Sequence, residues 1–327
     1  MNHTKKTLGK IVEILSKGHA FILTTHKDPD GDGIGSMLAL GQSLKQAGKQ
    51  VCLLLEESVP QPFDLLLGAD LIEQNVDLDI EWTAVVVLDC ADEKRLGGVA
   101  RTLDSVRPWI NIDHHETNTE FGDINFIEPK GSSTGELVYE IIKEAAFPIN
   151  SDIAEGIFAA IQTDTGSFRY DNTSSKAMRI AAEMIDLGVD PWEVTQKVMD
   201  GHDLSRLRLL KSALGTIELH HGGKIGVIVL TKSMFEEAGA NKLDSERFVD
   251  FVRFIRGVEI AALIRQTGHR RYKFSIRSNN KVNAAKLAFQ FGGGGHERAA
   301  GFDCEGDLVE LKQSFIREAG RFLDGTP

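Results

Sequence analysis

The chain has 327 residues, of which 42% are hydrophobic and 26% charged, and these proportions are typical of an ordinary globular protein. That length exceeds what one hydrophobic core usually supports, so two domains are expected. The net charge of −11 disfavours binding along a long nucleic acid, because such affinity comes mostly from Lys and Arg side chains that neutralise many phosphates.

The sequence predicts a cytoplasmic protein. No stretch approaches the roughly 20 consecutive apolar residues of a membrane span. An amphipathic helix, rather than a signal peptide, is indicated near the N-terminus by apolar residues at helical spacing: Leu8, Ile11, Val12 and Leu15. The three cysteines are widely separated and form no Cys-x-x-Cys pair, which argues against a disulfide framework and against a zinc knuckle.

A strand, an acidic loop and a helix are predicted in succession between residues 20 and 48. The apolar run 21–25 is typical of a strand and stops at His26. The loop that follows carries three aspartates among proline and glycine: Asp28, Asp30 and Asp32. In such a unit the loop lies at the carboxyl end of the strand, where open α/β sheets bind ligands. Because like charges repel, crowding these carboxylates is costly unless a cation is bound there.

Two further strands are predicted to end in potential metal ligands. The apolar run 84–88 has the continuous hydrophobicity of a strand buried on both faces, as in parallel sheets, and it ends at Asp89. The run 109–112 ends at three such residues in a row, Asp113, His114 and His115. Three separate strands therefore finish in potential metal ligands, a coincidence that random placement rarely produces.

Helices dominate the next part of the chain. They are predicted at 133–145, at 152–163 just before Asp164, and at 174–187. Residues 190–193 combine an N-cap aspartate, a proline at the first helical position and a glutamate in the first turn, so a new helix begins there. From residue 216 the pattern becomes rich in strands, predicted at 225–230, 259–264 and 272–277, with helices at 244–252, 282–290 and 307–323.

The predicted fold class is α/β with two domains. The larger N-terminal domain, residues 1–189, is expected to contain a mainly parallel sheet flanked by helices and a two-metal site. A helical connector, residues 190–214, leads to a smaller α/β domain with a mixed sheet and a substrate-binding role, residues 215–327.

The candidate metal ligands are carboxylates with a minority of imidazoles and no thiolate: His26, Asp30, Asp32, Asp89, His114 and Asp164, with His115 beside them. Such donors suit Mn²⁺ or Mg²⁺ better than structural zinc. Two divalent ions would also remove the repulsion among the aspartates. Two metals about 3.5–4 Å apart commonly activate a water and clamp a phosphate in an in-line displacement, so the sequence indicates phosphoester hydrolysis.

Together these motifs resemble those of the DHH phosphoesterase superfamily: His26-x-x-x-Asp30-x-Asp32, Leu88-Asp89, Asp113-His114-His115 and Asp164-Thr165-Gly166. The glycine-rich segment 292–301 resembles the signature of the DHH-associated domain. A compact two-domain chain of this length is most similar to the NrnA type, the RecJ-like branch of oligoribonucleases (nanoRNases) and pAp phosphatases.

The resemblance implies one metal held by His26, Asp30 and Asp89. It implies a second metal, and Mn²⁺ is the first choice for both, held by Asp32, Asp89, His114 and Asp164. Asp89 would then bridge the two ions beside the attacking water. His115 would contact the scissile phosphate or the leaving oxygen, and Asp113 would orient the histidine pair. Asp28 receives no role.

The C-terminal glycine run is the second predicted site. Consecutive glycines let backbone N–H groups converge on an anion. Residues 292–295 alone would indicate a flexible turn, but the adjacent His296 and the small residues 299–301 favour anion binding. Arg277 ends a predicted strand, and a guanidinium suits phosphate oxygens, although charged strand faces are often only solvated. The predicted substrate-binding residues are Arg277, Gly293, Gly294, Gly295 and His296. The first domain would cut while the second grips the far end of a very short nucleotide.

The expected function is hydrolysis of nanoRNA, or removal of the 3′-phosphate from 3′-phosphoadenosine 5′-phosphate (pAp). A phosphodiesterase of linear or cyclic dinucleotides (pApA, pGpG, cyclic di-AMP) is the main alternative. An inorganic pyrophosphatase would need a different C-terminal signature, and a RecJ-like exonuclease of long substrates is disfavoured by the acidity. A nucleotide sensor would be expected to have lost a metal ligand. The expected partners are these short substrates, with no long nucleic acid and no membrane, and a homodimer is left open.

Overall fold

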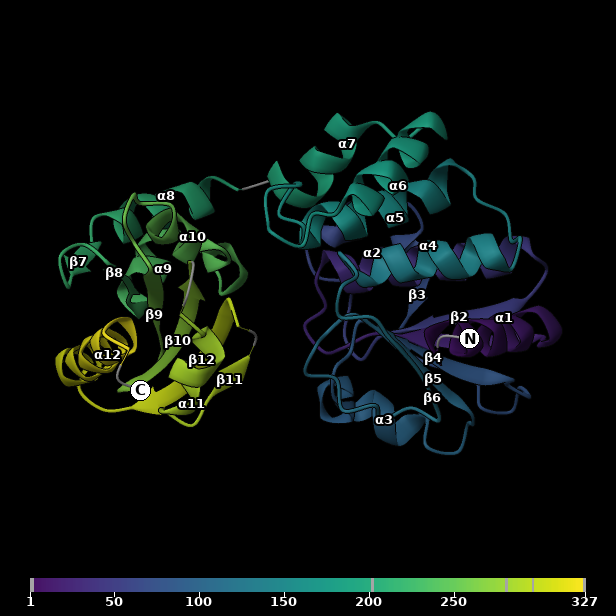
Figure 1. The fold of residues 1–327 in the computed structure, drawn as a ribbon, viewed down its shortest axis with the longest axis horizontal. Coiled ribbons are helices and arrows are strands. Elements are labelled where there is room, and N and C mark those ends of the chain that lie inside the picture. Colours follow the sequence, from purple (N-terminus) through teal and green to yellow (C-terminus); the bar gives the residue numbers. More distant parts are fainter. Residues whose placement is uncertain (1–2, 201–202, 280–281, 296, 326–327) are drawn as a thin grey trace. The chain divides into compact units, whose positions relative to one another are not determined.

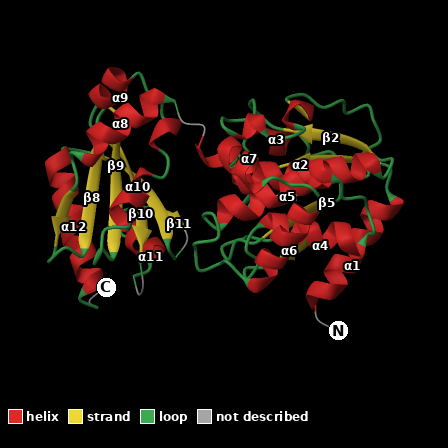
Figure 2. Cartoon of the chain, turned by 90° about the horizontal axis from the view of Figure 1, so that it is seen from above, coloured by secondary structure: helices red, strands yellow, loops and turns green. Residues whose placement is uncertain are grey.

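A computed structural model describes residues 3–200, 203–279, 282–295 and 297–325, and the chain divides into two compact units, residues 1–201 and 202–327 (Figure 1). Each unit has its own sheet, and helices and strands are mixed in both (Figure 2). The predicted α/β fold class is confirmed. Within the described ranges, no helix combines the length and apolar character needed to cross a lipid bilayer.

A six-stranded parallel sheet forms the centre of the first unit, in the order β3-β2-β1-β4-β5-β6. The strands are β1 (Ala20–Thr24), β2 (Gln50–Leu54), β3 (Ile72–Glu73), β4 (Ala84–Leu88), β5 (Trp109–Asp113) and β6 (Ile124–Ile127). Strands β1, β4 and β5 are buried along their whole length, as expected for apolar strands covered on both faces. The chain order reverses between β1 and β4. The carboxyl ends of these two strands therefore form the switch point at which open α/β sheets bind ligands.

Helices cover both faces of this sheet (Figure 1). The short α3 (Gly98–Thr102) lies on one face. The core on the other face is built with α1 (His3–Lys17), α2 (Gly31–Gln46), α4 (Thr134–Glu144), α5 (Ser151–Asp164) and α6 (Ser175–Asp186). Helix α2 is buried from Gly31 to Leu44 because it is packed between the sheet and α5.

Helices α2 and α5 approach each other through glycines. A Cβ atom added at Gly35 would lie 2.5 Å from the carbonyl oxygen of Gly156, and one added at Gly156 would lie 2.8 Å from the carbonyl oxygen of Gly35. Real Cβ atoms essentially never come this close to a backbone atom, so any side chain here pushes the helices apart. These helices carry Asp32 and Asp164, so the close approach also sets the distance between two candidate metal ligands.

Replacing Gly156 by alanine is therefore expected to lower the free energy of unfolding by about 1–3 kcal/mol, the usual cost of overpacking a core. Urea or thermal denaturation measures it. Gly9→Ala is the matched control, because Gly9 is an exposed helical glycine with nothing within 4 Å of the added methyl group. That control should raise stability by up to about 1 kcal/mol through helix propensity. An equal effect of both substitutions would contradict the close packing.

The predicted connector, residues 190–214, is divided between the two units. It contains α7 (Pro191–Thr195), a π-helical turn (Gln196–Asp200) and α8 (Leu204–Leu214). Val194 and Val198 pack into the core of the first unit, whereas Leu209 and Ala213 pack into a core of the second.

The second unit contains a six-stranded mixed sheet in the order β11-β12-β10-β9-β8-β7, in which only β8 and β9 are parallel. The strands are β7 (Glu218–His220), β8 (Ile225–Leu230), β9 (Ile260–Gly268), β10 (Arg271–Ser278), β11 (Gly294–Gly295) and β12 (Ala299–Glu305). The core on one face includes α8 with α9 (Lys232–Ala238) and α10 (Phe248–Arg253). On the other face it includes α11 (Ala284–Phe289) and α12 (Leu308–Leu323).

Candidate metal centre

The carboxyl edge of the parallel sheet brings the predicted ligands together. His26 follows β1, Asp89 follows β4 and His114 follows β5, and these three strands are neighbours in the sheet. The remaining ligands lie at helix ends, with Asp30 and Asp32 at the start of α2 and Asp164 at the end of α5. Three overlapping groups have ligand atoms that all lie within 4.8 Å of one another: His26, Asp30 and Asp89; Asp32, His114 and Asp164; and Asp89, His114 and His115.

Asp89 lies between the two imidazoles. Its Oδ2 atom is 3.7 Å from Nε2 of His26, and its Oδ1 atom is 3.7 Å from Nε2 of His114. The same His114 nitrogen is 3.5 Å from Oδ2 of Asp32 and 3.6 Å from Oδ2 of Asp164. Atoms bound about 2.1 Å from one cation lie roughly 3–4 Å apart, so these spacings suit ligands of a shared ion. The Oδ1 atom also lies 3.6 Å from Nδ1 of His115. The two oxygens of Asp89 thus face His26 on one side and His114 on the other, as expected of a bridging carboxylate.

The backbone at Asp89 is unusual. Its φ of +55° lies in the left-handed region, which is uncommon for residues other than glycine but is tolerated by aspartate and asparagine. The Asp89 N–H still donates to the carbonyl of Ile112 on β5 at 3.0 Å. The Thr134 hydroxyl donates to Asp89 Oδ1 at 3.2 Å. This turn therefore directs the Asp89 carboxylate into the cluster while the Asp89 backbone stays hydrogen-bonded to β5.

Two helix N-termini hold the aspartates of the first loop. Asp30 caps α2, and its Oδ1 atom accepts hydrogen bonds from the N–H groups of Asp32 and Gly33 at 3.0 and 3.2 Å. Asp32 accepts from the N–H groups of Thr134 and Gly135 at the start of α4, at 2.6 and 2.9 Å. Helix N-termini favour negative charge, and these N–H groups hold both carboxylates in place.

The crowded carboxylates resist ionisation when no cation is present. Burial raises the pKa of Asp89 well above its usual value, and Asp32 and Asp30 raise it further by repulsion. Burial raises the pKa of Asp32 to about 7, opposed by His114 and reinforced by Asp164. The pKa of Asp164 is raised for the same reason, with His114 again opposing. Bound divalent cations would offset these penalties, which fits the donor set.

Asp113 contacts both histidines that follow it. Its Oδ1 atom lies 2.6 Å from Nδ1 of His115 and accepts the backbone N–H of His114 at 2.8 Å. Its Oδ2 atom accepts from the side-chain amide of Asn118 at 2.6 Å. Although burial alone would raise the pKa of Asp113, the hydrogen bonds from His115 and Asn118 lower it to about 2. Because a carboxylate only accepts, Nδ1 of His115 carries the proton in this pair.

Three residues around the ligands were not predicted from the sequence. Thr134 and Asn118 make the contacts just described. Asn172 donates to Oδ2 of Asp164 at 3.1 Å and to the Ser132 carbonyl at 2.9 Å. Each lies among other polar residues in a loop or at a helix start, so nothing in its sequence neighbourhood singles it out as part of a site.

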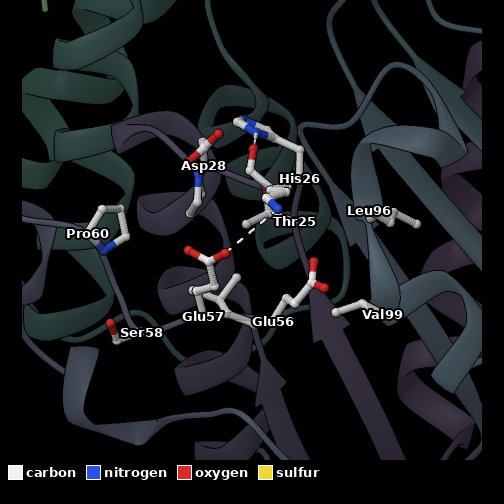
Figure 3. A pocket seen from close by; sticks show the side chains of 12 residues that line it. Thr25, His26, Asp28, Glu56, Glu57, Ser58, Pro60, Leu96 and Val99 are labelled. Carbon is white, nitrogen blue, oxygen red and sulfur yellow. Dashed lines mark hydrogen bonds and ion pairs between the residues drawn. The ribbon is translucent and has the colours of Figure 1, made fainter. Parts of the chain in front are cut away.

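A small hollow lies beside His26 (Figure 3). Its volume is about 50 Å³, enough for only a few water-sized groups. Polar and apolar side chains line it, among them Thr25, His26, Asp28, Glu56, Glu57, Ser58, Pro60, Leu96 and Val99. Asp28 therefore lines the hollow beside the candidate metal ligands, but it belongs to none of the three ligand groups.

In the second unit, the glycine run packs against β12. Gly294 and Gly295 pair with Gly301 and Ala300 of that strand. A Cβ atom at Gly295 would lie 2.6 Å from the Ala299 carbonyl, and Gly293 is equally constrained by the Gly301 carbonyl, whereas nothing lies near such an atom at Gly294. Close packing thus accounts for two of these glycines.

Arg277 is half-buried on β10, in register with Ala299, and donates to the Ile276 carbonyl at 3.0 Å. His296 lies outside the described residues. The anion-binding role expected of this region stays a prediction.

The chain is similar to known proteins over most of its length. A model of the DHH family, N-terminal domain, matches residues 20–161, and a model of the DHHA1 domain matches residues 224–324. The bifunctional oligoribonuclease and PAP phosphatase NrnA of Thermus thermophilus is 34% identical over 90% of this chain and 86% of that protein. The crystal structure of an exopolyphosphatase-related protein from Bacteroides fragilis has a TM-score of 0.90 and 27% identity, covering 98% of each chain. RecJ of Thermus thermophilus, solved in complex with Mn²⁺, has a TM-score of 0.52 and 15% identity, covering 99% of this chain and 55% of RecJ, which is a likeness of fold.

Proposed function

The chain belongs to the DHH family and is a hydrolase of phosphoester bonds, and on that premise we propose that it hydrolyses very short nucleotides with the help of two divalent cations. The proposed substrates are oligoribonucleotides of a few residues and pAp, the substrates in the name of the Thermus relative. The observation that carries the proposal is the convergence of carboxylates and imidazoles at the switch point of the parallel sheet. The cytoplasm is the proposed location.

The residues present suit Mn²⁺, with Mg²⁺ as the second choice, because carboxylate oxygens and imidazole nitrogens are the donors and no thiolate takes part. His26, Asp30 and Asp89 would hold one ion. The other would be held by Asp32, Asp89, His114 and Asp164. When bound, such a pair of ions polarises a phosphoryl oxygen and lowers the pKa of a water molecule.

His115 and Asp113 would manage the proton of the leaving group. In the hydrolysis, water forms a new bond to phosphorus, the bond from phosphorus to the leaving oxygen breaks, and that oxygen takes up a proton. The Asp113 carboxylate, 2.6 Å from Nδ1, fixes the orientation of the His115 ring. His115 can then donate from Nε2 to the leaving oxygen as a general acid.

The second unit would bind the end of the substrate away from the bond that is cut. Arg277 offers a guanidinium on a half-buried strand position, and Gly294 leaves open space beside the backbone. With Gly293, Gly295 and His296, these residues would limit the length of the bound nucleotide. The proposal fits the net charge of −11, which disfavours long nucleic acids.

A side-by-side hydrolysis panel tests the proposed function. With Mn²⁺, we expect pAp and RNAs of three to five nucleotides to be turned over faster than the dinucleotides pApA and pGpG, cyclic di-AMP and pyrophosphate. EDTA should abolish turnover, because it removes the ions that would lower the pKa of the attacking water. Product chromatography measures each rate. Turnover confined to the dinucleotides would replace the proposal with the phosphodiesterase alternative. Turnover of pyrophosphate alone, or of no compound at stoichiometric enzyme, would refute it in favour of a pyrophosphatase or a sensor.

A further inference from the structure

Arg95 contacts Nδ1 of the candidate metal ligand His26, the ring nitrogen that does not face Asp89. Its Nη2 atom is 3.0 Å from Nδ1 of His26, and the Lys27 carbonyl oxygen is 2.8 Å from the same nitrogen. A neutral imidazole carries one proton, so Nδ1 can donate to the Lys27 carbonyl or accept from Arg95, but it cannot do both.

Metal binding by His26 decides between these two states. The other ring nitrogen, Nε2, is the atom that faces Asp89, at 3.7 Å. To ligate an ion, Nε2 must offer its lone pair, so the proton then lies on Nδ1 and is donated to the Lys27 carbonyl. In that state the Arg95 N–H group faces another donor, and the guanidinium needs a different acceptor.

The backbone keeps Arg95 beside the site. Its N–H donates to the Asp92 carbonyl at 2.9 Å, and its carbonyl accepts the N–H of Lys27 at 2.7 Å, which ties this turn to the loop of His26. The next residue, Leu96, is buried in the core on the face of the sheet that α3 covers. The Arg95 side chain itself is exposed, and no carboxylate among the described residues forms an ion pair with it.

We propose that Arg95 binds a non-bridging phosphate oxygen of the substrate, which makes it a further substrate-binding residue of the first unit. The inference rests on the proposed function, because it assumes that His26 holds an ion and that the ligand carries a phosphate. A phosphate offers the anionic acceptor that Arg95 lacks once His26 is a ligand, and the planar guanidinium suits its oxygens. In the free protein Arg95 returns to His26.

The test compares Arg95→Gln with Lys94→Gln, which removes one charge from the neighbouring exposed residue of the same turn. Calorimetry measures the affinity of the Mn²⁺-loaded protein for inorganic phosphate. Steady-state kinetics gives kcat and KM for pAp, and the affinity for Mn²⁺ is measured separately. Arg95→Gln should weaken phosphate binding and lower kcat/KM on the order of 10–100-fold, the effect of losing a charged hydrogen bond. Lys94→Gln should change neither by more than about twofold, as expected of a surface charge. The Mn²⁺ affinity should be the same in all three proteins.

Unchanged phosphate binding in Arg95→Gln would overturn the inference. So would a lower affinity for Mn²⁺ with normal phosphate binding, which would instead make Arg95 a positioning residue for His26. If the wild-type protein hydrolysed no compound of the panel, the proposed function would fail, but the phosphate measurements would still decide the role of Arg95. Arg95→Lys should recover only part of the affinity, because an ammonium keeps the charge and loses the planar fork.

Discussion

Replacing Asp89 by asparagine is expected to lower turnover on the order of a thousandfold or more and, at the same time, to stabilise the protein when no metal is present. Turnover falls because the Asp89 oxygens face both His26 and His114, so one substitution removes a charge from both proposed ion positions. Stability rises because the substitution removes the carboxylate whose pKa burial and repulsion raise well above normal. Asparagine also tolerates the φ of +55°, so the turn is preserved.

The two effects are measured separately, by kcat with the best substrate of the panel and by thermal denaturation in EDTA. Asp186→Asn is the control, because this exposed aspartate lies at the end of α6, away from the carboxyl edge of the sheet. It should change neither quantity. Near-normal turnover in Asp89→Asn would show that the shared-ligand assignment is wrong, and a destabilised metal-free variant would contradict the repulsion.

The second large effect concerns pH. Without metal, the free energy of unfolding should fall as pH rises from about 5 to 7.5, whereas with Mn²⁺ this slope should largely disappear. Asp32, with a pKa of about 7 in the folded protein, binds a proton across this window that it would lose in the unfolded chain, and Asp89 and Asp164 act in the same direction. Stability that is present at low pH is therefore lost as pH rises through these folded-state values.

The pKa values of His114 and His26, two histidines that face Asp89, are shifted in opposite directions. The pKa of His114 is raised by Asp164 and Asp32 despite burial, so it adds to the fall at higher pH. Burial lowers the pKa of His26, which opposes the trend up to its ordinary value. Asp32, Asp89, Asp164 and His114 all lower the free energy of unfolding as pH rises, and only His26 acts in the opposite direction within this pH window. We therefore expect the free energy of unfolding to fall with pH.

Denaturation in EDTA at several pH values, repeated with Mn²⁺, measures this slope. At a hundredfold excess over its Kd, an ion that binds only the folded state adds about 2.7 kcal/mol. That gain should grow with pH, because protons compete with the ion for the same carboxylates. Asp89→Asn should reduce both the slope and the gain. A metal-free protein whose stability rises steadily with pH between these limits would contradict the predicted repulsion.

Several strands of both units could be predicted because their signals are local. The apolar runs 84–88 and 225–230 coincide with β4 and β8, and buried parallel strands need little more than such a run. Several short or half-buried elements gave no comparable signal and were missed, among them β3, β6, β7, α3 and α9.

The second unit shows a different limit. Residues 299–301 were grouped with the glycine-rich segment 292–301 and not predicted as a strand, but they begin β12. Their small side chains allow β11 to lie close to that strand. Composition alone does not separate a glycine needed for packing from one needed for binding an anion. Contacts between distant residues, such as Thr134 with Asp89 or Arg95 with His26, depend on the fold and leave no pattern in the sequence.

The order in which the ligands occur along the chain has a consequence for biosynthesis. They begin at His26, at the middle of the sheet, and end at Asp164, the last residue of α5. The group His26, Asp30 and Asp89 lies within the first 89 residues, whereas the group that includes Asp164 is complete only once α5 has left the ribosome and docked against α2. We therefore expect the proposed ion at Asp32, His114 and Asp164 to bind only after most of the first unit has been synthesised.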